Sequence, residues 1–98
     1  MGQAIMTMRL DEDKILRDGE YDLEKLKALL KESREAHDIV QISETEFEGS
    51  AEDVLFEVTD YSDEDWIMEN LSELKITFKP DGAVEDILQL WKDGELDI

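Results

Sequence analysis

The sequence predicts a small α+β domain in which a three-stranded, mainly antiparallel sheet is covered by helices, in the order α-α-β-β-α-β-α. Two kinds of apolar spacing predict this class. Some segments repeat apolar residues at helical spacing, and others alternate them at every second position. The 98 residues, of which 41% are hydrophobic, suffice for one modest core. We therefore expect residues 1–98 to form a single domain, with no linker or internal repeat.

The first two elements are predicted to be helices. Asp11 can accept the free amides of a short first helix, and Gly19 can adopt the left-handed conformation that ends it. Asp22 precedes a longer segment, 23–36, in which leucines recur on one face. Both segments therefore carry a helix start signal and an apolar stripe.

Three strands are expected where apolar residues alternate, at positions 39–47, 54–59 and 74–78. In the second strand, Val54, Phe56 and Val58 share one face, and the other face is partly covered. The glycine–serine break at 49–50 is short, which predicts an antiparallel hairpin between the first two strands.

Two more helices complete the predicted fold. Ser62 is expected to cap the first of them, with Asp65 reaching back to the Ser62 amide. This helix carries three large apolar residues in succession at 66–68, which span more than one helical face. We therefore expect one of them, Met68, to be exposed. The last helix is expected at 83–92, after a Pro-Asp-Gly turn.

Charge is unevenly distributed along the chain. There are 28 Asp and Glu residues against 10 Lys and Arg, which gives a net charge of −18 at pH 7. No lysine or arginine lies between Arg34 and Lys75, although the forty residues between them include fourteen carboxylates. Apolar residues keep strand and helix spacing through this stretch, so we expect it to be folded rather than an acidic tail. A folded surface of one sign costs stability through self-repulsion, which favours a functional use for it.

Composition excludes several classes of function. Direct binding to nucleic acid or to anionic membranes needs clustered Lys and Arg, and this chain has the opposite charge. The absence of cysteine excludes disulfides and thiolate chemistry, and it fits a reducing cytoplasm. No apolar run approaches the roughly 20 residues that span a bilayer. We expect a cytoplasmic protein of a bacterial host cell, and a basic protein as its partner.

The amino-terminal residues do not resemble a signal peptide. Residues 1–8 lack a basic region and a long apolar core. Because Met6 and Met8 are alternative starts, we interpret residues 1–8 as a leader or an expression remnant.

No catalytic or metal-binding motif stands out in the sequence. His37 is the sole histidine, and although Ser33 lies four residues before it, we interpret His37 as a solvated residue at a helix end. An EF-hand loop starting at Asp60 fails at positions 6 and 12, and one starting at Asp11 fails at position 5. No glycine-rich phosphate loop is present. We therefore expect no enzyme, no cofactor and no dedicated metal site, while weak binding of divalent ions stays open.

Carboxylates are predicted to form two rows that imitate the phosphates of a nucleic acid strand. Acidic residues at i and i+4 of a helix lie about 6 Å apart, close to the phosphate separation along one strand. Alternate positions of a strand likewise share one face. The predicted partner-binding residues are Glu44, Glu46 and Glu48 in one row, Asp60, Asp63, Glu64, Asp65, Glu69 and Glu73 in the other, and Trp66 as an anchor.

Plainer interpretations compete with this one. Solvated helix faces show the same spacing of carboxylates, so the acidity can serve solubility alone. Trp66 also sits at apolar helical spacing, which is typical of core packing. A halophilic origin fits the acidity but not the lysine content or the many large aliphatic residues.

Two parts of the sequence resemble small uncharacterised acidic proteins of bacterial mobile elements, that is, phages, plasmids and conjugative islands. The resemblance covers about a fifth of the chain and rests on the segments DEDKI at 11–15, DGEYD at 18–22 and WIMENL at 66–71. It implies a context rather than an activity. Mobile elements carry small acidic inhibitors of host defence, including anti-CRISPR and anti-restriction proteins, and some of these look like DNA to their targets.

Charge and resemblance together lead to one expected function and one alternative. We expect a non-enzymatic inhibitor that occupies the basic nucleic-acid groove of a host-defence protein. The alternative is an immunity or antitoxin protein that neutralises a cationic toxin. In that case Tyr61 and Trp66 would matter more than the glutamates, because a compact patch needs an aromatic anchor.

Overall fold

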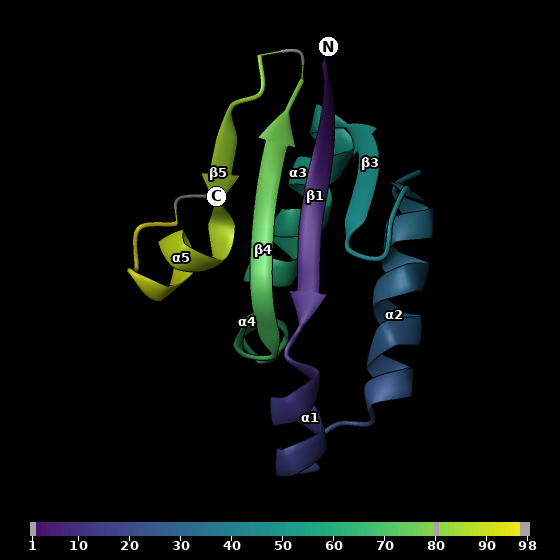
Figure 1. The fold of residues 1–98 in the computed structure, drawn as a ribbon, viewed down its shortest axis with the longest axis vertical. Coiled ribbons are helices and arrows are strands. Elements are labelled where there is room, and N and C mark those ends of the chain that lie inside the picture. Colours follow the sequence, from purple (N-terminus) through teal and green to yellow (C-terminus); the bar gives the residue numbers. More distant parts are fainter. Residues whose placement is uncertain (1, 80, 97–98) are drawn as a thin grey trace.

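The computed structural model describes residues 2–79 and 81–96. Within these residues the chain is a small α+β domain with a five-stranded antiparallel sheet and five helices, in the order β-α-α-β-β-α-α-β-β-α (Figure 1). The predicted three-stranded sheet and its element order are therefore wrong. The strands are β1 (Gln3–Leu10), β2 (Val40–Gln41), β3 (Glu46–Ser50), β4 (Leu71–Phe78) and β5 (Val84–Asp86). The helices are α1 (Glu12–Asp18), α2 (Leu23–Ala36), α3 (Ala51–Ser62), α4 (Asp65–Glu69) and α5 (Ile87–Lys92).

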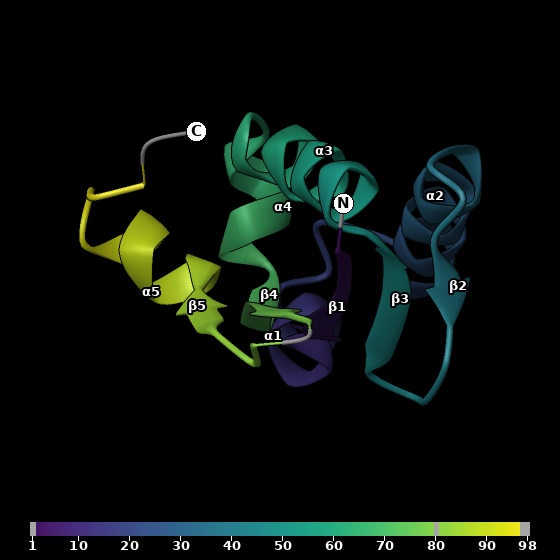
Figure 2. The same cartoon turned by 90° about the horizontal axis from the view of Figure 1, so that it is seen from above.

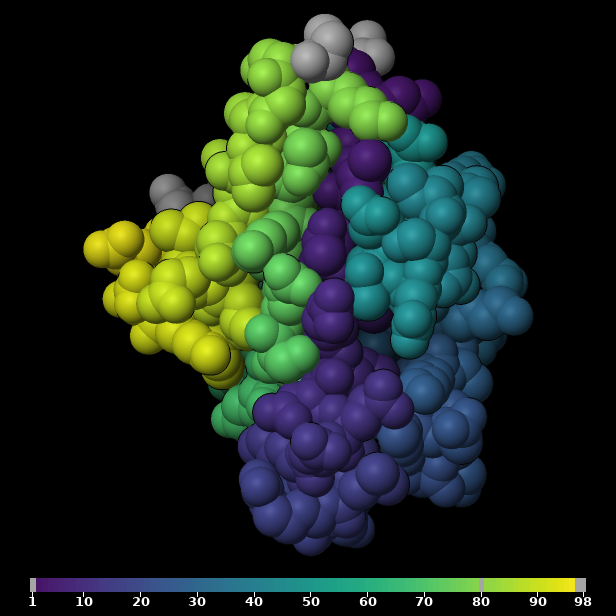
Figure 3. All heavy atoms as spheres, viewed as in Figure 1, coloured from purple at the N-terminus to yellow at the C-terminus, as the bar shows by residue number. Residues whose placement is uncertain are grey.

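Helices cover one face of the sheet and leave much of the other face open. The strand order is β2-β3-β1-β4-β5, so β1 lies in the middle. Figure 2 shows α2, α3 and α4 on the same side of the sheet. Figure 3 looks onto the opposite side, where β1 is visible between β3 and β4 with no helix over it. Side chains on the two faces of the sheet therefore meet different surroundings.

The central strand comes from the segment expected to lie outside the fold. In β1, Ala4 and Met6 are fully buried and Met8 is nearly so, because they face the helical layer. β1 pairs antiparallel with β3 and with β4. Residues 3–8 are therefore part of the fold, since every other side chain from Ala4 to Met8 lies in the core.

Both predicted amino-terminal helices are confirmed. Asp11 Oδ1 accepts a hydrogen bond from the Lys14 amide at 3.2 Å, and Gly19 ends α1 with a φ of 62°. Asp22 Oδ1 accepts from the Lys25 amide at 3.1 Å. Because these caps satisfy amides that the helix itself leaves free, the sequence signals were sufficient to place both starts.

The first predicted strand, 39–47, is wrong in its extent. Only Val40–Gln41 belongs to β2, and the chain turns before β3 begins at Glu46. Gly49 was expected to break the strand, but it is buried inside β3. A Cβ at this position would lie 3.1 Å from Ile39 Cγ1, so the glycine allows close packing of the chain leading into β2.

The second predicted strand, 54–59, is wrong because this segment is part of helix α3. Ser50 Oγ accepts from the Asp53 amide at 3.1 Å and so starts the helix. Val54, Val58 and Tyr61 are buried at helical spacing, while Phe56 is exposed. A pattern of alternating apolar residues also contains the i, i+4 pair of a helix, and here burial of that pair decides the structure.

The helix expected to start at Ser62 starts later. Ser62 is the last residue of α3, and its Oγ donates to the Thr59 carbonyl at 3.0 Å. Helix α4 begins at Asp65 without a side-chain cap. Met68 was expected to be exposed, but it is buried. A two-residue break at Asp63 and Glu64 separates α3 from α4, and both Ile67 and Met68 of α4 lie in the core.

Near the carboxyl terminus, the predicted strand at 74–78 is confirmed within the longer β4, whereas the predicted helix at 83–92 is only partly right. Val84–Asp86 pairs with β4 as the short edge strand β5. Asp86 Oδ1 accepts from the Gln89 amide at 3.1 Å, which places the helix start at Ile87. Pro80 of the predicted turn lies outside the described residues, and Gly82 has a φ of 76°.

One core holds these elements together. It lies between the sheet and the helices and draws on β1, β3, β4 and all five helices. Fully burying one such aliphatic side chain contributes about 1.5–3 kcal/mol. Among the described residues, no helix combines the length and apolarity needed to cross a bilayer.

Candidate functional site

Four of the predicted partner-binding residues meet around one surface hollow. The hollow lies between α2 and the α3–α4 segment and has a volume of about 370 Å³. We call it the acidic hollow, and its lining consists of Leu29, Leu30, Ser33, Asp60, Tyr61, Asp63, Glu64, Trp66 and Ile67. Its walls thus combine three carboxylates with a largely apolar floor.

Carboxylates of the acidic hollow lack strong partners within the chain. Asp63 and Glu64 are exposed, and neither has a Lys, Arg or His within 4.0 Å among residues 2–79 and 81–96. Asp60 has a single cationic neighbour, because its Oδ2 lies 3.8 Å from Nε2 of His37. The negative charge of the hollow is therefore available to an external cation.

Trp66 forms part of the wall rather than a projecting anchor. Its ring is half-buried and stacks on Tyr21, with 5.2 Å between ring centroids and 30° between ring planes. Its Nε1 donates to Glu64 Oε2 at 3.1 Å. This hydrogen bond fixes one carboxylate beside an aromatic ring, a pairing that suits the planar, charged guanidinium of an arginine.

The other predicted residues are dispersed over the molecule. Asp65 and Glu69 are exposed at either end of the short helix α4. Glu46 and Glu48 flank the buried Phe47 in β3, so they point to the open face of the sheet, away from α3. Glu73 of the other predicted row also lies on this open face, so neither predicted row is assembled as expected.

Ion pairs within the chain neutralise much of the acidity on the open face. Lys79 Nζ lies 2.7 Å from Glu48 Oε2. Glu73 is held by Arg9 at 3.0 Å and by Lys75 at 3.2 Å. Because these glutamates already have cationic partners, they offer an external partner less charge than the acidic hollow does.

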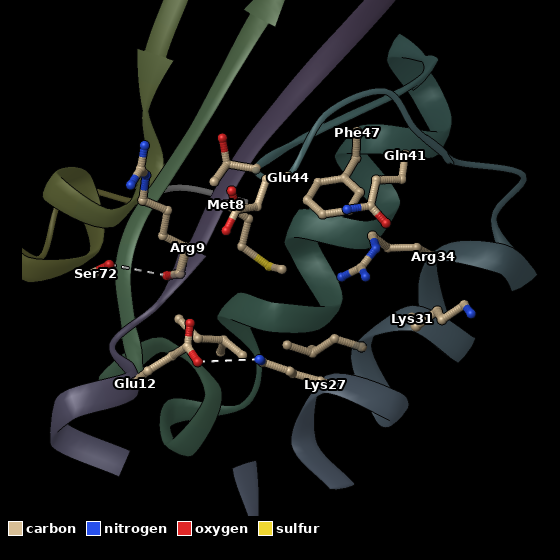
Figure 4. A pocket seen from close by; sticks show the side chains of 13 residues that line it. Met8, Arg9, Glu12, Lys27, Lys31, Arg34, Gln41, Glu44, Phe47 and Ser72 are labelled. Carbon is tan, nitrogen blue, oxygen red and sulfur yellow. Dashed lines mark hydrogen bonds and ion pairs between the residues drawn. The ribbon is translucent and has the colours of Figure 1, made fainter. Parts of the chain in front are cut away.

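A larger hollow, of about 440 Å³, lies between α2 and the β1–β3 side of the sheet and is the place where Glu44 is found (Figure 4). Its lining includes four of the ten basic residues, Arg9, Lys27, Lys31 and Arg34. Lys27 Nζ pairs with Glu12 at 3.2 Å, and the ends of Arg9 and Lys31 point away from the middle of the hollow in Figure 4. Lys27, Arg9 and Lys31 therefore already form ion pairs with glutamates of this chain.

Arg34 has a structural role beside this larger hollow. Its guanidinium carbon lies 4.1 Å from the centre of the Phe47 ring, in a cation–π contact. Its Nη1 is buried without a hydrogen-bond partner among the described residues. Tyr61 Oη is likewise buried without a hydrogen-bond partner among the described residues. Its burial is the main reason that the pKa of Tyr61 is far above its usual range, and the nearby negative charge of Glu57 raises it further. Tyr61 is 1% exposed, so it is not available as a partner anchor.

Buried polar contacts join α2 to α3 beneath the acidic hollow. Glu57 is fully buried, and its Oε1 lies 2.7 Å from His37 Nδ1 and accepts from Ser33 Oγ at 2.8 Å. The hydrogen bond to Glu57 raises the pKa of His37, although burial of the ring opposes this effect. The negative charges of Glu57, Asp60 and Asp53 raise the pKa further. His37 is thus half-buried and paired, which corrects its interpretation as a solvated residue at a helix end.

Two important residues were missed in the sequence. Glu57 lies at helical spacing among Val54, Val58 and Tyr61, and this polar residue on a buried stripe is the signal that a helical reading would have shown. Phe56 is 52% exposed on the outer face of α3 beside Leu55, which is 39% exposed. These two side chains place an apolar patch on an otherwise acidic helix.

Comparison of this chain with family models, with curated proteins and with solved structures finds no match.

Proposed function

We propose that this protein is an acidic, non-enzymatic inhibitor that binds the basic nucleic-acid groove of a host-defence protein through the acidic hollow. The observation that carries the proposal is the meeting of Asp60, Asp63 and Glu64 with Trp66 over an apolar floor. The resemblance to acidic proteins of mobile elements supports a target in the cytoplasm of a bacterial host. The fourteen carboxylates between Arg34 and Lys75 add a long-range field that speeds association with a basic surface.

Shape and chemistry of the hollow suit one partner side chain in particular. An arginine has an aliphatic stem that packs on apolar residues such as Leu29 and Ile67, and a planar guanidinium that binds carboxylates. Basic grooves that bind DNA present such arginines at phosphate spacing. In this proposal one arginine of the groove enters the hollow, and neighbouring cations contact exposed carboxylates such as Asp65.

Substitutions of matched charge test the proposal. The variant Asp63→Asn/Glu64→Gln removes two charges from the hollow, and Glu85→Gln/Glu95→Gln removes two charges from exposed positions elsewhere. Each tagged protein is used to capture partners from a bacterial lysate, followed by stepwise elution with salt and mass spectrometry. We expect the unaltered protein and the control to retain one nucleic-acid-binding protein at high salt, and the hollow variant to lose it. Release of many basic proteins at modest salt by all three would contradict the proposal.

A cationic toxin is the second candidate partner, and the exposed apolar patch of Phe56 and Leu55 favours it. Compact interfaces are dominated by a few buried aromatic or aliphatic anchors, and this patch provides them. The substitution Phe56→Ala distinguishes the two candidates. It should abolish capture of a toxin but leave capture of a groove protein nearly unchanged, because the patch lies outside the acidic hollow.

A further inference from the structure

A second hollow adjoins the acidic hollow on the side toward the start of α2. It has a volume of about 350 Å³, and its lining includes Tyr21, Leu26, Leu29 and Trp66. We call it the tyrosine hollow. Leu29 and Trp66 line both hollows, so the two form adjoining halves of one groove between α2 and α4.

The boundary between the two hollows is apolar and exposed. Leu29 is 47% exposed and Tyr21 is 37% exposed, although both side chains are large and mainly apolar. The Tyr21 ring stacks on Trp66, whose own ring is half-buried. Apolar residues that are exposed next to one another, rather than singly, are typical of a binding surface.

Carboxylates surround this apolar boundary. Five exposed ones line the groove, namely Glu20, Asp22, Asp60, Asp63 and Glu64. Lys25 is the single cation among the described residues that line either hollow. An apolar floor within a ring of carboxylates is complementary to a segment that carries cations and an apolar side chain together, and it repels a second copy of this acidic chain.

Contacts along α2 indicate how long such a segment is. Leu26 in the tyrosine hollow and Ser33 in the acidic hollow are seven residues apart on α2, which corresponds to about 10 Å along the helix axis. An extended chain advances about 3.3 Å per residue, so three or four residues cover this length. Side chains at i and i+2 of an extended chain point to the same side, about 7 Å apart, and can therefore enter the two hollows together.

We propose that the groove binds a short extended segment of the partner in which an arginine and a large aliphatic residue lie two positions apart. The arginine enters the acidic hollow, and the aliphatic side chain packs on Leu29 and Tyr21 in the tyrosine hollow. This inference rests on the proposed function, because it adds an apolar subsite to the hollow that binds the arginine. It defines the partner by a mixed basic and apolar segment rather than by positive charge alone.

Two synthetic peptides of equal charge test the apolar subsite. One consists of two repeats of Arg-Arg-Leu-Leu and the other of two repeats of Arg-Arg-Ser-Ser, both with blocked termini. Binding is followed by NMR through the indole N–H of Trp66, which donates to Glu64. Because the chain has two tryptophans, the spectrum of Trp91→Phe assigns this resonance. We expect the leucine peptide to bind at least about tenfold tighter than the serine peptide, since burial of an aliphatic side chain supplies such a factor.

A pair of leucine substitutions locates the subsite. Leu29→Ser removes the apolar boundary and should abolish the preference for the leucine peptide. Leu16→Ser is the matched control, because Leu16 is a 67% exposed helical leucine that lines neither hollow, and it should leave the preference intact. Amide resonances of the sheet confirm that both variants keep the fold.

Several results would overturn the proposal. These are equal affinity for the two peptides, no binding of either peptide at millimolar concentration, or equal effects of Leu29→Ser and Leu16→Ser. A dimer of this protein in sedimentation that Leu29→Ser dissociates would also overturn it, because a second copy would then cover the groove.

The variant Asp63→Asn/Glu64→Gln separates this inference from the proposed function. If both peptides bind the unaltered protein equally and this variant weakens both, only the apolar subsite fails. If the leucine peptide is preferred and this variant has no effect, the apolar subsite stands and the acidic hollow fails as the site of the arginine.

Discussion

Glu57 occupies a position where the core would otherwise accept an aliphatic side chain. It lies on the same buried face of α3 as Val54, Val58 and Tyr61, yet its carboxylate must be paired. His37 and Ser33 of α2 provide the pairing. The network therefore helps to specify how α2 and α3 are joined, because the buried Glu57 carboxylate contacts two side chains of the α2 segment.

Removing the Glu57 carboxylate should strongly destabilise the protein. Glu57→Ala deletes two hydrogen bonds to a charged group, leaves a cavity and deprives His37 of its partner, so we expect a loss of about 3 kcal/mol in the free energy of unfolding. Urea denaturation followed by circular dichroism measures this loss. Glu52→Ala, an exposed position of the same helix, serves as the control and should change stability by less than about 0.5 kcal/mol. Equal effects of the two substitutions would show that Glu57 is not buried.

The contribution of His37 to stability should depend on pH. Its pKa is raised in the folded state above the ordinary value of 6.5, so the stabilisation is fully present below pH 6.5 and is lost as the pH rises through the folded-state pKa. We therefore expect the stability difference between the unaltered protein and His37→Gln to be largest near pH 6 and to shrink at higher pH. Urea denaturation in the presence of a chelator, repeated across this pH range, measures it. A difference that does not vary with pH would contradict the pairing with Glu57.

At the scale of elements, helix α3 shows why part of the fold escaped sequence analysis. Val54, Phe56 and Val58 alternate like a strand, but Ser50 caps the segment and acidic residues fill its first turn, as is typical of a helix. Local spacing alone does not distinguish the two structures here. Packing against β1 and β3 decides it, and that information is not local in the sequence.

Two substitutions in α3 separate a helix from a strand. In the helix Val54 is fully buried and Phe56 is 52% exposed, whereas in a strand both would share one face. Val54→Ala should therefore cost about 2 kcal/mol, and Phe56→Ala less than about 0.5 kcal/mol. Thermal and urea unfolding of the two variants measure the costs. Similar large costs for both would contradict the helical assignment.

The other elements also differ in whether local sequence is enough to predict them. Helices α1 and α2 were predictable because Asp11 and Asp22 are capping residues whose effect is local. Strand β1 was missed because its apolar residues do not alternate cleanly with polar ones, and only its partners β3 and β4 reveal that it is central. Strand β5 was missed because it depends on pairing with β4, as between Val84 and Thr77, which also lies outside the local sequence.

For the whole molecule, the excess of negative charge should make stability sensitive to salt. The 28 Asp and Glu residues outnumber the 10 Lys and Arg residues, so repulsion between carboxylates opposes folding. Raising the NaCl concentration from 10 mM to 300 mM shortens the screening length from about 30 Å to below 8 Å and weakens this repulsion. We expect the melting temperature to rise by a few degrees, as measured by scanning calorimetry. A fall in melting temperature would show that attractive pairs dominate instead.

The sequence indicated the sign of the surface charge but not its arrangement. Asp60, Asp63, Glu64 and Trp66 were predicted as partner-binding residues, and folding brings them together at the acidic hollow. Glu46, Glu48 and Glu73 were assigned to the same ladder, but they lie on the open face of the sheet. Strand pairing determines this division, and it is a long-range feature.

Competition with DNA tests the central claim most directly. A labelled DNA duplex is bound to the captured partner, and this protein is then titrated into the complex. We predict displacement of the duplex by the unaltered protein and by Glu85→Gln/Glu95→Gln, and displacement weakened at least about tenfold for Asp63→Asn/Glu64→Gln. A duplex that stays bound while this protein also binds, or equal displacement by both double variants, would contradict binding of the basic groove by the acidic hollow.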